Sequence, residues 1–321
     1  MSILITGGCG YIGSHLCVEL LNNNYQVVII DNLTNSYPSV FDGIQSISNK
    51  QLIVYNFDIC DVNLLSNVFE EHKPDTVIHL AGHKSIIESI SSPIMYYENN
   101  VNSTIILIQT MEKYNCRKFI FSSTAAVYSP KLLPPFNEEC DVNPSSPYGS
   151  NKLIIEDKLK QLKDWNIIVL RYFNPIGCHP SGLIKENPKK EYKNVIPILI
   201  ECVEKNEPFS ILGNDYNTRD GTTIRDYIDV CDIAKGHLQA LKNLHKHKYE
   251  IINLGSGTGV TLLELIKAVE QATNTKIDVV NCERRDGDSA QSFSDITKAT
   301  TMLNWKPTIT IEESCKHLFV K

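Results

Sequence analysis

The sequence predicts an α/β protein built on a doubly wound sheet of parallel strands, followed by a smaller C-terminal α/β domain. Three observations support this prediction. Short apolar runs rich in β-branched residues alternate with helix-like segments through the first half of the chain. The runs are nearly continuously apolar, which is typical of strands buried on both faces. Between the first run and the first helix-like segment lies a glycine-rich turn, in TGGCGYIGSH.

The elements of the first domain follow in regular order. The expected strands are the apolar runs at residues 3–6, 26–30, 52–55, 76–80, 118–121 and 167–170. The expected helices are the segments in which apolar residues recur at helical spacing, at residues 14–21, 63–72 and 101–114. This alternation predicts a Rossmann-type sheet.

The alternation weakens after residue 174. A polar stretch, GLIKENPKKEYKN, predicts a surface loop, and it is followed by an expected helix at 262–272 and an expected strand at 277–280. We therefore divide the chain into residues 1–174, with a possible return to that domain near 225–245, and residues 175–321.

The glycine-rich turn has the spacing of a dinucleotide-binding loop. Gly7, Gly10 and Gly13 let the backbone turn tightly and approach a pyrophosphate, and the following helix N-terminus offers NH groups and a favourable dipole. The second expected strand ends at Asp31, where such folds place an acid on the ribose 2′-hydroxyl of NAD. A carboxylate there would repel the 2′-phosphate of NADP, so the pattern favours NAD over NADP. The strand before the loop, the helix after it and the acid together favour a dinucleotide-binding loop over a plain βα turn.

The stretch SSPYGSNK contains a candidate acid–base pair, Tyr148 and Lys152. A Ser-Pro helix start precedes the tyrosine, and i,i+4 spacing places both side chains on one helix face. The preceding strand ends in Thr124, at the sheet edge where such folds bind ligands. Tyr114 and Lys118 have the same spacing but lie between a helix and a strand, where packing and surface roles are expected.

Composition excludes several classes of protein. The net charge of −6 argues against a nucleic-acid-binding surface, and no apolar run approaches the ~18 residues of a membrane span. The ten cysteines form no CxxC motif, which favours reduced thiols in a cytoplasmic protein. No histidine spacing indicates a metal site, and His245 and His247 lie in a lysine-rich stretch that predicts a basic loop.

Several motifs together resemble the UDP-glucose 4-epimerase family of the extended short-chain dehydrogenase/reductases. They are TGGCGYIGSH, Asp31-Asn32-Leu33, HLAGHKS, YYENNV, SST with YGSNK, RYFNPIG and RRDGD, spread from residue 3 to residue 305. The resemblance implies an NAD-binding domain at 1–174 and a UDP-sugar-binding domain at 175–321. It also implies a homodimer, in which the helices around 101–114 and 148–162 pack into a four-helix bundle.

The resemblance also implies site residues. The catalytic residues would be Thr124, Tyr148 and Lys152. The cofactor residues would be Gly7, Gly10, Tyr11, Ile12, Gly13, Asp31, Asn32, Asp58, Ile59, Leu80, Ala81, Gly82, Lys84, Asn99, Tyr148, Lys152 and Phe173. The UDP-hexose residues would be Thr124, Asn174, Asn194, Ser210, Leu212, Arg225, Arg285, Asp288 and Ser292. Two departures from the family pattern, Ala126 and Ser129, lie off the expected proton path.

The chemistry implied is removal and return of the hydride at C4 of the sugar through a 4-keto intermediate, with Tyr148 as the base. Tyrosine has an ordinary pKa of ~10, so action near neutrality needs a drop of roughly 3 units. A lysine charge at ~6 Å gives about 2.8 kcal/mol, or about 2 units, at an effective dielectric constant of ~20. Because burial opposes the shift, we expect full activation of Tyr148 only with oxidised cofactor bound.

The expected sugar range depends on one residue. In the resembling family, the fourth residue after the aspartate of RRDGD borders the sugar 2-position, and here it is Ser292. A small residue there leaves room for an acetamido group, so we expect UDP-N-acetylglucosamine and UDP-N-acetylgalactosamine to be substrates as well as UDP-glucose and UDP-galactose. A shift of one residue in the alignment would place Phe293 there and close the pocket.

Two alternative functions are considered. A sugar-nucleotide 4,6-dehydratase needs an acidic pair after the threonine, whereas this chain has Ala125 and Ala126. A non-catalytic NAD-binding scaffold would not need Thr124, Tyr148 and Lys152 together.

Overall fold

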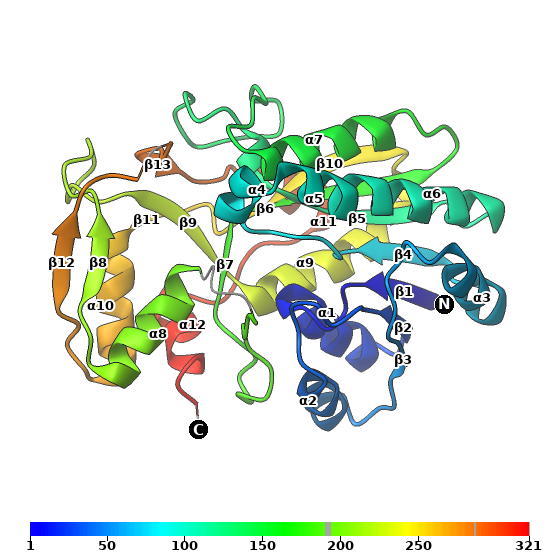
Figure 1. Cartoon of the computed structure of the whole chain (residues 1–321), viewed down its shortest axis with the longest axis horizontal. Coiled ribbons are helices and arrows are strands. Elements are labelled where there is room, and N and C mark those ends of the chain that lie inside the picture. The colour runs from blue at the N-terminus through cyan, green and yellow to red at the C-terminus, as the bar shows by residue number, and fades with distance from the viewer. Residues whose placement is uncertain (190–193, 286, 321) are drawn as a thin grey trace.

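A computed structural model describes residues 1–189, 194–285 and 287–320 of the chain. Within these residues the largest unit is a sheet of seven parallel strands, in the spatial order β10-β6-β5-β4-β1-β2-β3 (Figure 1). The strands are β1 (Ser2–Thr6), β2 (Gln26–Ile30), β3 (Ile53–Tyr55), β4 (Thr76–His79), β5 (Lys118–Thr124), β6 (Asn166–Tyr172) and β10 (Tyr249–Leu254). The predicted fold class is therefore confirmed.

The six expected strands are all present. The seventh strand, β10, was not expected and lies just after the segment at 225–245 that was expected to return to this domain. Helix α9 (Val230–Asn243) lies within the expected return at 225–245, but strand β10 begins after it. The sequence does not identify β10 because Glu250 and Asn253 interrupt its short apolar run and its first half is only half-buried. The expected assignment of NAD to residues 1–174 and of the UDP-sugar to residues 175–321 stays a prediction.

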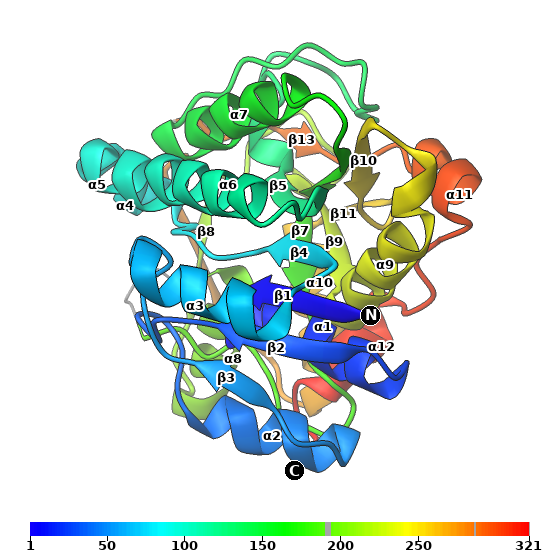
Figure 2. The ribbon, with the colours of Figure 1, turned by 90° about the vertical axis from the view of Figure 1, so that its right-hand side faces the viewer.

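Helices cover both faces of this sheet (Figure 2). On one face lie α3 (Val62–His72), α6 (Ser103–Lys113) and α7 (Pro147–Lys160), which share one buried apolar cluster with the strands. On the other face lie α1 (Tyr11–Asn22), α2 (Ser39–Ser48), α9 and α11 (Thr297–Leu303). The strands are thus buried on both sides, which explains their continuous apolar character.

Local signals explain where these helices begin. The Asp61 side chain accepts hydrogen bonds from the backbone NH groups of residues 63 and 64, at the start of α3. The Ser146 hydroxyl accepts from the NH group of Gly149, and Pro147 occupies the first position of α7. Short helices precede and follow these elements: α4 (Ile86–Ser91), α5 (Pro93–Tyr97), the π-helical turn η1 (Glu98–Asn102), and the 3-10 turns η2 (Ala125–Val127) and η3 (Leu244–Lys246).

A second, smaller unit lies beside the sheet, at the left of Figure 1. Its strands are β7 (Asn174–Ile176), β8 (Phe209–Leu212), β9 (Ile224–Asp229), β11 (Gly259–Thr261), β12 (Val279–Cys282) and β13 (Gln291–Ser292). Its helices are α8 (Val195–Lys205), α10 (Leu262–Thr273) and α12 (Ile311–His317). The helix expected at 262–272 is α10, and the strand expected at 277–280 is found two residues later as β12. This unit has its own apolar core, which includes Leu199, Leu265 and Cys315.

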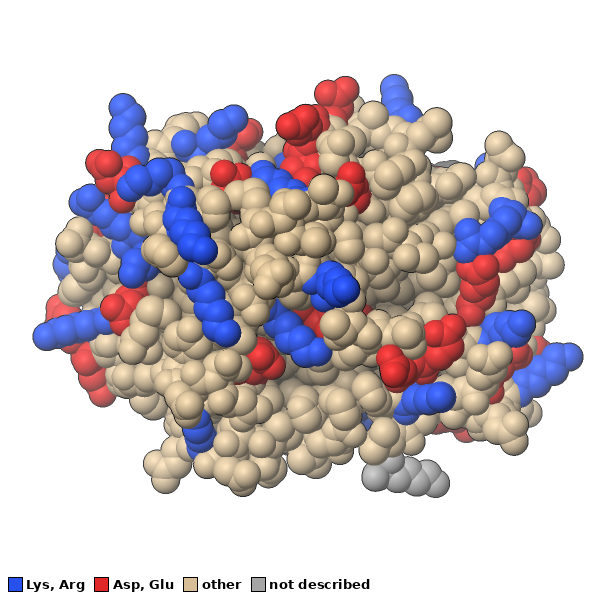
Figure 3. All heavy atoms as spheres, turned by 180° about the vertical axis from the view of Figure 1, so that it is seen from behind, with Lys and Arg blue, Asp and Glu red and all other residues tan. Residues whose placement is uncertain are grey.

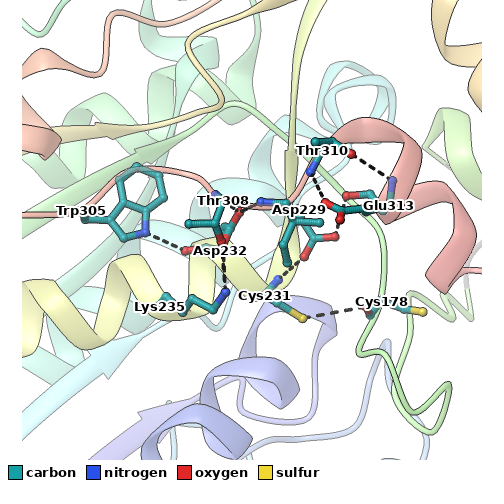
Figure 4. A network of polar contacts seen from close by, with 11 residues as sticks. Cys178, Asp229, Cys231, Asp232, Lys235, Trp305, Thr308, Thr310 and Glu313 are labelled. Carbon is teal, nitrogen blue, oxygen red and sulfur yellow. Dashed lines mark hydrogen bonds and ion pairs between the residues drawn. The ribbon is translucent and has the colours of Figure 1, made fainter.

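Two buried aspartates fasten the C-terminal segment to the start of α9 (Figure 4). The Asp232 carboxylate accepts from the backbone NH groups of Thr308 (2.7 Å) and Ile309 (2.8 Å). The Asp229 carboxylate accepts from the Ser314 hydroxyl at 2.6 Å, and its pKa is raised by burial. Because α9 covers the large sheet, these contacts join the chain's last residues to it.

Charged residues of both signs are interspersed over the face shown in Figure 3, and uncharged residues cover most of it. Among the described residues, no helix is long and apolar enough to cross a lipid bilayer.

Candidate cofactor and substrate site

A cavity of about 370 Å³ opens at the carboxyl ends of the central strands. It is lined by all the residues expected to bind the cofactor, from Gly7 in the glycine loop to Phe173 after β6. Residues far apart in the sequence thus meet at one edge of the sheet, as parallel topology requires. That they bind NAD stays a prediction at the level of each residue.

The glycine loop leaves no space for side chains. Gly7 has a φ of +74°, and a Cβ there would lie 2.6 Å from the backbone nitrogen of Ala81. A Cβ on Gly13 would lie 2.2 Å from the carbonyl oxygen of Gly7. The start of α1 can therefore pack directly against the first βα turn, with residues 10–13 lining the cavity. This cradle fits a dinucleotide pyrophosphate.

Asp31 lies at the end of β2, on the floor of the same cavity. Its carboxylate accepts hydrogen bonds from the NH groups of Cys9 (2.9 Å) and Leu33 (2.8 Å), which hold it beside the glycine loop. Next to it, the Asn32 amide donates to Asp58 at 3.0 Å. Burial would raise the pKa of Asp58, but hydrogen bonds from Cys60 and Asn32 lower it, so this acid stays ionised. The arrangement suits the hydroxyl and amine donors of an adenosine.

Thr124, Tyr148 and Lys152 meet on the opposite wall of the cavity. Thr124 ends β5, and its hydroxyl accepts from the NH group of Ala126 at 3.1 Å. Burial raises the pKa of Tyr148 to about 12, and a hydrogen bond with Thr124 lowers it in part. The tyrosine is therefore protonated when only the protein's own groups surround it.

Lys152 is buried and held by a backbone carbonyl. Its Nζ donates to the Ser122 oxygen at 2.7 Å and lies 4.8 Å from the centre of the Phe121 ring. Burial lowers its pKa to about 8, while the Glu156 carboxylate raises it. Burial thus dominates the pKa of Tyr148 in the protein alone, as expected, and the 2-unit lowering by the charge of Lys152 stays a prediction.

A buried ion pair supports this wall. Glu156, one turn after Lys152 on α7, accepts from Arg171 Nε at 3.1 Å and from its terminal nitrogen at 2.6 Å. The same carboxylate accepts from the Ser123 hydroxyl at 2.5 Å. The bidentate pair ties α7 to β6, and the Ser123 hydrogen bond ties it to β5, so the helix that carries Tyr148 and Lys152 is fixed against the sheet.

The residues expected to bind UDP-hexose fall into two groups. Thr124, Asn174 and Asn194 line the cavity. The other six lie outside its lining, on the second unit: Ser210, Leu212, Arg225, Arg285, Asp288 and Ser292. Of these, the Asp288 carboxylate accepts from Arg225 at 3.4 Å and from Arg285 at 2.7 Å, so three of the expected ligands form one cluster.

Strand pairing places Ser292 on the same side as Arg225. The two residues are opposite each other in the parallel pair of β13 and β9, so their side chains share a face. The next residue, Phe293, packs against Gly259 on the other face. A Cβ added to Gly259 would lie 2.8 Å from the Phe293 ring. Ser292, and not Phe293, therefore shares the Arg225 face, while which of the two residues borders the sugar stays a prediction.

Comparison with known proteins supplies the family. The sequence profile described as the NAD dependent epimerase/dehydratase family matches residues 3–255. The UDP-glucose 4-epimerase of Bacillus subtilis (strain 168) is 43% identical over 321 residues, covering 98% of this chain and 95% of that protein. The chain belongs to this family, among the UDP-glucose 4-epimerases. The expected family, enzyme class and NAD cofactor are thereby confirmed.

Solved structures of the UDP-glucose 4-epimerase family have the same fold. One, a UDP-glucose 4-epimerase from Stenotrophomonas maltophila with bound NAD and formylated UDP-arabinopyranose, has a TM-score of 0.97 and 38% identity. It covers 99% of this chain, which covers 97% of it. Another, a UDP-Glc/GlcNAc 4-epimerase from Campylobacter jejuni, has a TM-score of 0.87 and 32% identity, with 99% and 98% of the two chains covered.

The structure of this family member also adds lining residues that the motifs did not indicate. One group follows Asp31 and comprises Thr34, Asn35, Ser36 and Tyr37. The other comprises Lys185, Glu186, Asn187 and Pro188, within the polar stretch expected to be a surface loop. The expected loop is confirmed for residues 182–189, which form no helix or strand, but residues 185–188 of this loop also line the cavity. Residues 190–193 of that stretch lie outside the described ranges. Polarity alone cannot separate a solvated loop from the wall of a polar site.

Proposed function

We propose that this protein interconverts UDP-glucose and UDP-galactose at C4 of the sugar, using NAD that it retains between turnovers. The observation that carries the proposal is the meeting of Thr124, Tyr148 and Lys152 with the glycine loop and Asp31 around one cavity. Family membership supports it. The UDP end of the substrate is assigned to the second unit, where two arginines and Asp288 form a cluster.

Tyr148 acts as the base in this proposal. Its phenolate oxygen accepts the proton of the sugar 4-hydroxyl, with the Thr124 hydroxyl beside it to share that proton. Bound NAD, held by the residues around the glycine loop and Asp31, would supply hydride-transfer chemistry at C4, so that the hydride could return to the other face of the 4-keto sugar. Tyr148 then gives its proton back to the C4 oxygen, so that the product is the C4 epimer and no reductant is consumed.

The raised pKa of Tyr148 couples this base to the state of the cofactor. Burial raises the pKa to about 12, so Lys152 and the hydrogen bond from Thr124 do not activate the tyrosine by themselves. A positive charge on a nicotinamide ring near the phenol would lower this pKa further and would act together with the lysine. The base is therefore strongest when hydride can be accepted, which prevents deprotonation of a sugar that cannot react.

The local sequence favours epimerisation over dehydration. A 4,6-dehydratase needs carboxyl groups after the threonine, and here the 3-10 turn η2 supplies Ala125, Ala126 and Val127. A silent NAD-binding scaffold would gain nothing from a buried lysine with a lowered pKa, because burying that charge is costly.

We further propose that N-acetylated UDP-hexoses are substrates. The small side chain of Ser292 on the Arg225 face, with Phe293 turned away, supports an open wall near the sugar 2-position. The similarity to the UDP-Glc/GlcNAc 4-epimerase of Campylobacter jejuni agrees with this. A cytoplasmic location stays a prediction, and the free state of all ten cysteines, which lie within the described ranges, supports it.

The test is the product formed from each UDP-sugar by the purified protein with no added nucleotide. UDP-galactose should give UDP-glucose, and UDP-N-acetylglucosamine should give UDP-N-acetylgalactosamine. Denaturation should release NAD(H). An active protein that purifies without nucleotide and needs a continuous external supply would contradict the retained cofactor, and a 4-keto-6-deoxy product would favour the dehydratase.

A further inference from the structure

Residues 179–189 form a strap along the outer wall of the cavity. The strap leaves the second unit after β7 and reaches α2, where buried Ile184 packs so closely on Gly43 that a Cβ there would lie 2.8 Å from it. Further along, the Lys189 ammonium donates to the carbonyl oxygen of Leu33 at 2.9 Å. The strap therefore has a fixed position against the loop that follows Asp31, and its residues 185–188 line the cavity.

Glu186, in the middle of the strap, joins two residues from different parts of the chain. Its side chain is only 8% exposed. One carboxylate oxygen, Oε1, accepts from Lys84 Nζ at 2.5 Å and from Asn194 Nδ2 at 2.7 Å. Lys84 follows β4 in the sheet, whereas Asn194 immediately precedes α8 in the second unit. A single oxygen is thus the shared acceptor for two cavity-lining donors, one that follows a strand of the large sheet and one from the second unit.

The Glu186 carboxylate lies among residues that are expected to hold anionic ligands. The carboxylate helps to raise the pKa of Tyr11, after burial, which places its negative charge close to the glycine loop. Dinucleotides and UDP-sugars are both anionic at their diphosphates, so a nearby carboxylate repels them. The ion pair with Lys84 offsets this charge, and the hydrogen bonds hold the lysine and the amide in place.

We propose that Glu186 is a positioning residue that links the cofactor half of the site to the sugar-nucleotide half, by fixing Lys84 and Asn194 on one oxygen. The inference rests on the proposed function, with Lys84 as an expected cofactor residue and Asn194 as an expected UDP-hexose residue. Glu186 takes no part in proton transfer. Its loss should therefore weaken substrate binding and cofactor retention together, while the pH dependence set by Tyr148 stays as in the wild type.

The experiment compares Glu186→Ala with Glu186→Gln in the NAD-loaded enzyme. The alanine variant loses the acceptor oxygen, so the KM for UDP-galactose should rise about tenfold and NAD should be released about tenfold faster, the size expected for a hydrogen bond to a charged group. The kcat should stay within a few-fold. The glutamine variant keeps an acceptor oxygen and should restore both values to within about threefold of wild type.

Two other roles predict different results. If Glu186 acts only through its charge, both variants should behave alike and lower the KM, because a repulsive group has been removed. If it only supports the fold, both variants should have a lower melting temperature, a lower kcat and a higher KM. Either result would overturn the proposal. Glu204→Ala, which removes an exposed carboxylate from α8, is the matched control and should change none of these values.

A double-variant cycle separates the proposal from the proposed function. In an Asn194→Ala background, Glu186→Ala should raise the KM no further, because the donor that it orients is already absent. Additive losses would contradict the link. If the wild type does not epimerise UDP-galactose, the proposed function fails. The Kd of UDP-galactose and the rate of NAD release can then be measured for the same four proteins, and these values still decide the role of Glu186.

Discussion

At the scale of single residues, the two YxxxK pairs show how position decides the role of a tyrosine. Tyr148 lines the cavity, beside Thr124. Tyr114, at the end of α6, stacks on Phe69 with ring centres 5.6 Å apart and donates from its hydroxyl to Glu70 at 2.6 Å. The spacing is the same in both, but only one pair faces the site.

The first prediction compares the two tyrosines. Tyr148→Phe keeps the ring but removes the proton acceptor, so kcat for UDP-galactose should fall by roughly 10²- to 10⁴-fold. Tyr114→Phe loses one exposed hydrogen bond, worth ~1 kcal/mol of stability, and should leave turnover within a few-fold. Steady-state kinetics on both variants tests this, and equal losses would mean that the active site is misplaced.

The second prediction concerns the pH dependence of stability. The pKa of Lys152 is about 8 in the folded protein and 10.5 ordinarily, so burying the charged form costs roughly 3 kcal/mol. The unfolded chain binds more protons between these values, so this contribution makes the free energy of unfolding rise with pH across that interval. Below the folded pKa the cost is present in full.

Denaturant unfolding of wild type and Lys152→Met, from about pH 8 to about pH 10, measures this contribution. The wild type should gain stability relative to the variant across the interval, while the other titrating groups cancel in the difference. Work above pH 10 is avoided because the raised pKa of Tyr148 acts in the opposite direction there. A difference that stays constant with pH would show that the lysine is not buried as described.

The residues of the cofactor loop and the catalytic wall could be identified from the sequence because each belongs to a short motif at the end of an apolar run. Burial could not be identified in the same way. The raised pKa of Tyr148 and the lowered pKa of Lys152 depend on atoms contributed by many segments. The role of Glu186 depends on a contact between residues 84, 186 and 194, which no local pattern reveals.

At the scale of elements, the sheet was predictable because its strands are buried on both faces and therefore continuously apolar. Two elements were not. Strand β10 lies at the edge of the sheet, with a half-buried first half that includes Glu250. The strap is polar although it lines the cavity. In both cases the environment comes from tertiary contacts, which override local composition.

The third prediction belongs to the pairing of β13 with β9. Ser292→Tyr adds a ring on the Arg225 face, where an acetamido group would lie. Turnover of UDP-N-acetylglucosamine should fall by roughly 10- to 100-fold, the cost of overpacking a closed site, while UDP-galactose turnover stays within a few-fold.

The matched control is Ser46→Tyr, which adds the same ring at an exposed serine of α2, outside the cavity lining. In this variant the turnover of both UDP-N-acetylglucosamine and UDP-galactose should stay within a few-fold of wild type. A wild type that epimerises UDP-galactose well but leaves UDP-N-acetylglucosamine unchanged would refute the open wall.

At the scale of the whole molecule, one surface suggests how two chains could meet. Large apolar side chains are exposed on α4 and α5, including Ile90 (64% exposed) and Ile94 (74% exposed). These helices contact α7, one of the two helices expected in a four-helix bundle, and lie with it in the upper layer of Figure 1. Helices α6 and α7 themselves are mostly covered or half-buried on their apolar positions.

The fourth prediction is a homodimer that uses this surface. The chain has a mass of 36.2 kDa, and light scattering at micromolar concentration should give twice this value. Ile94→Glu should shift the mass toward the monomer, because it places a charge within an apolar interface. Leu133→Glu, at an exposed leucine of the loop between β5 and α7, is the control and should leave the mass unchanged. A monomeric wild type would contradict the prediction.

The central claim is that the hydride removed from C4 is returned to C4 of the same sugar by cofactor that never leaves. The most direct measurement supplies UDP-galactose carrying deuterium at C4 to the purified protein in ordinary water, with no added nucleotide. The account predicts UDP-glucose that retains the deuterium at C4. Loss of the deuterium to solvent, or failure to form UDP-glucose while NAD is bound, would contradict it.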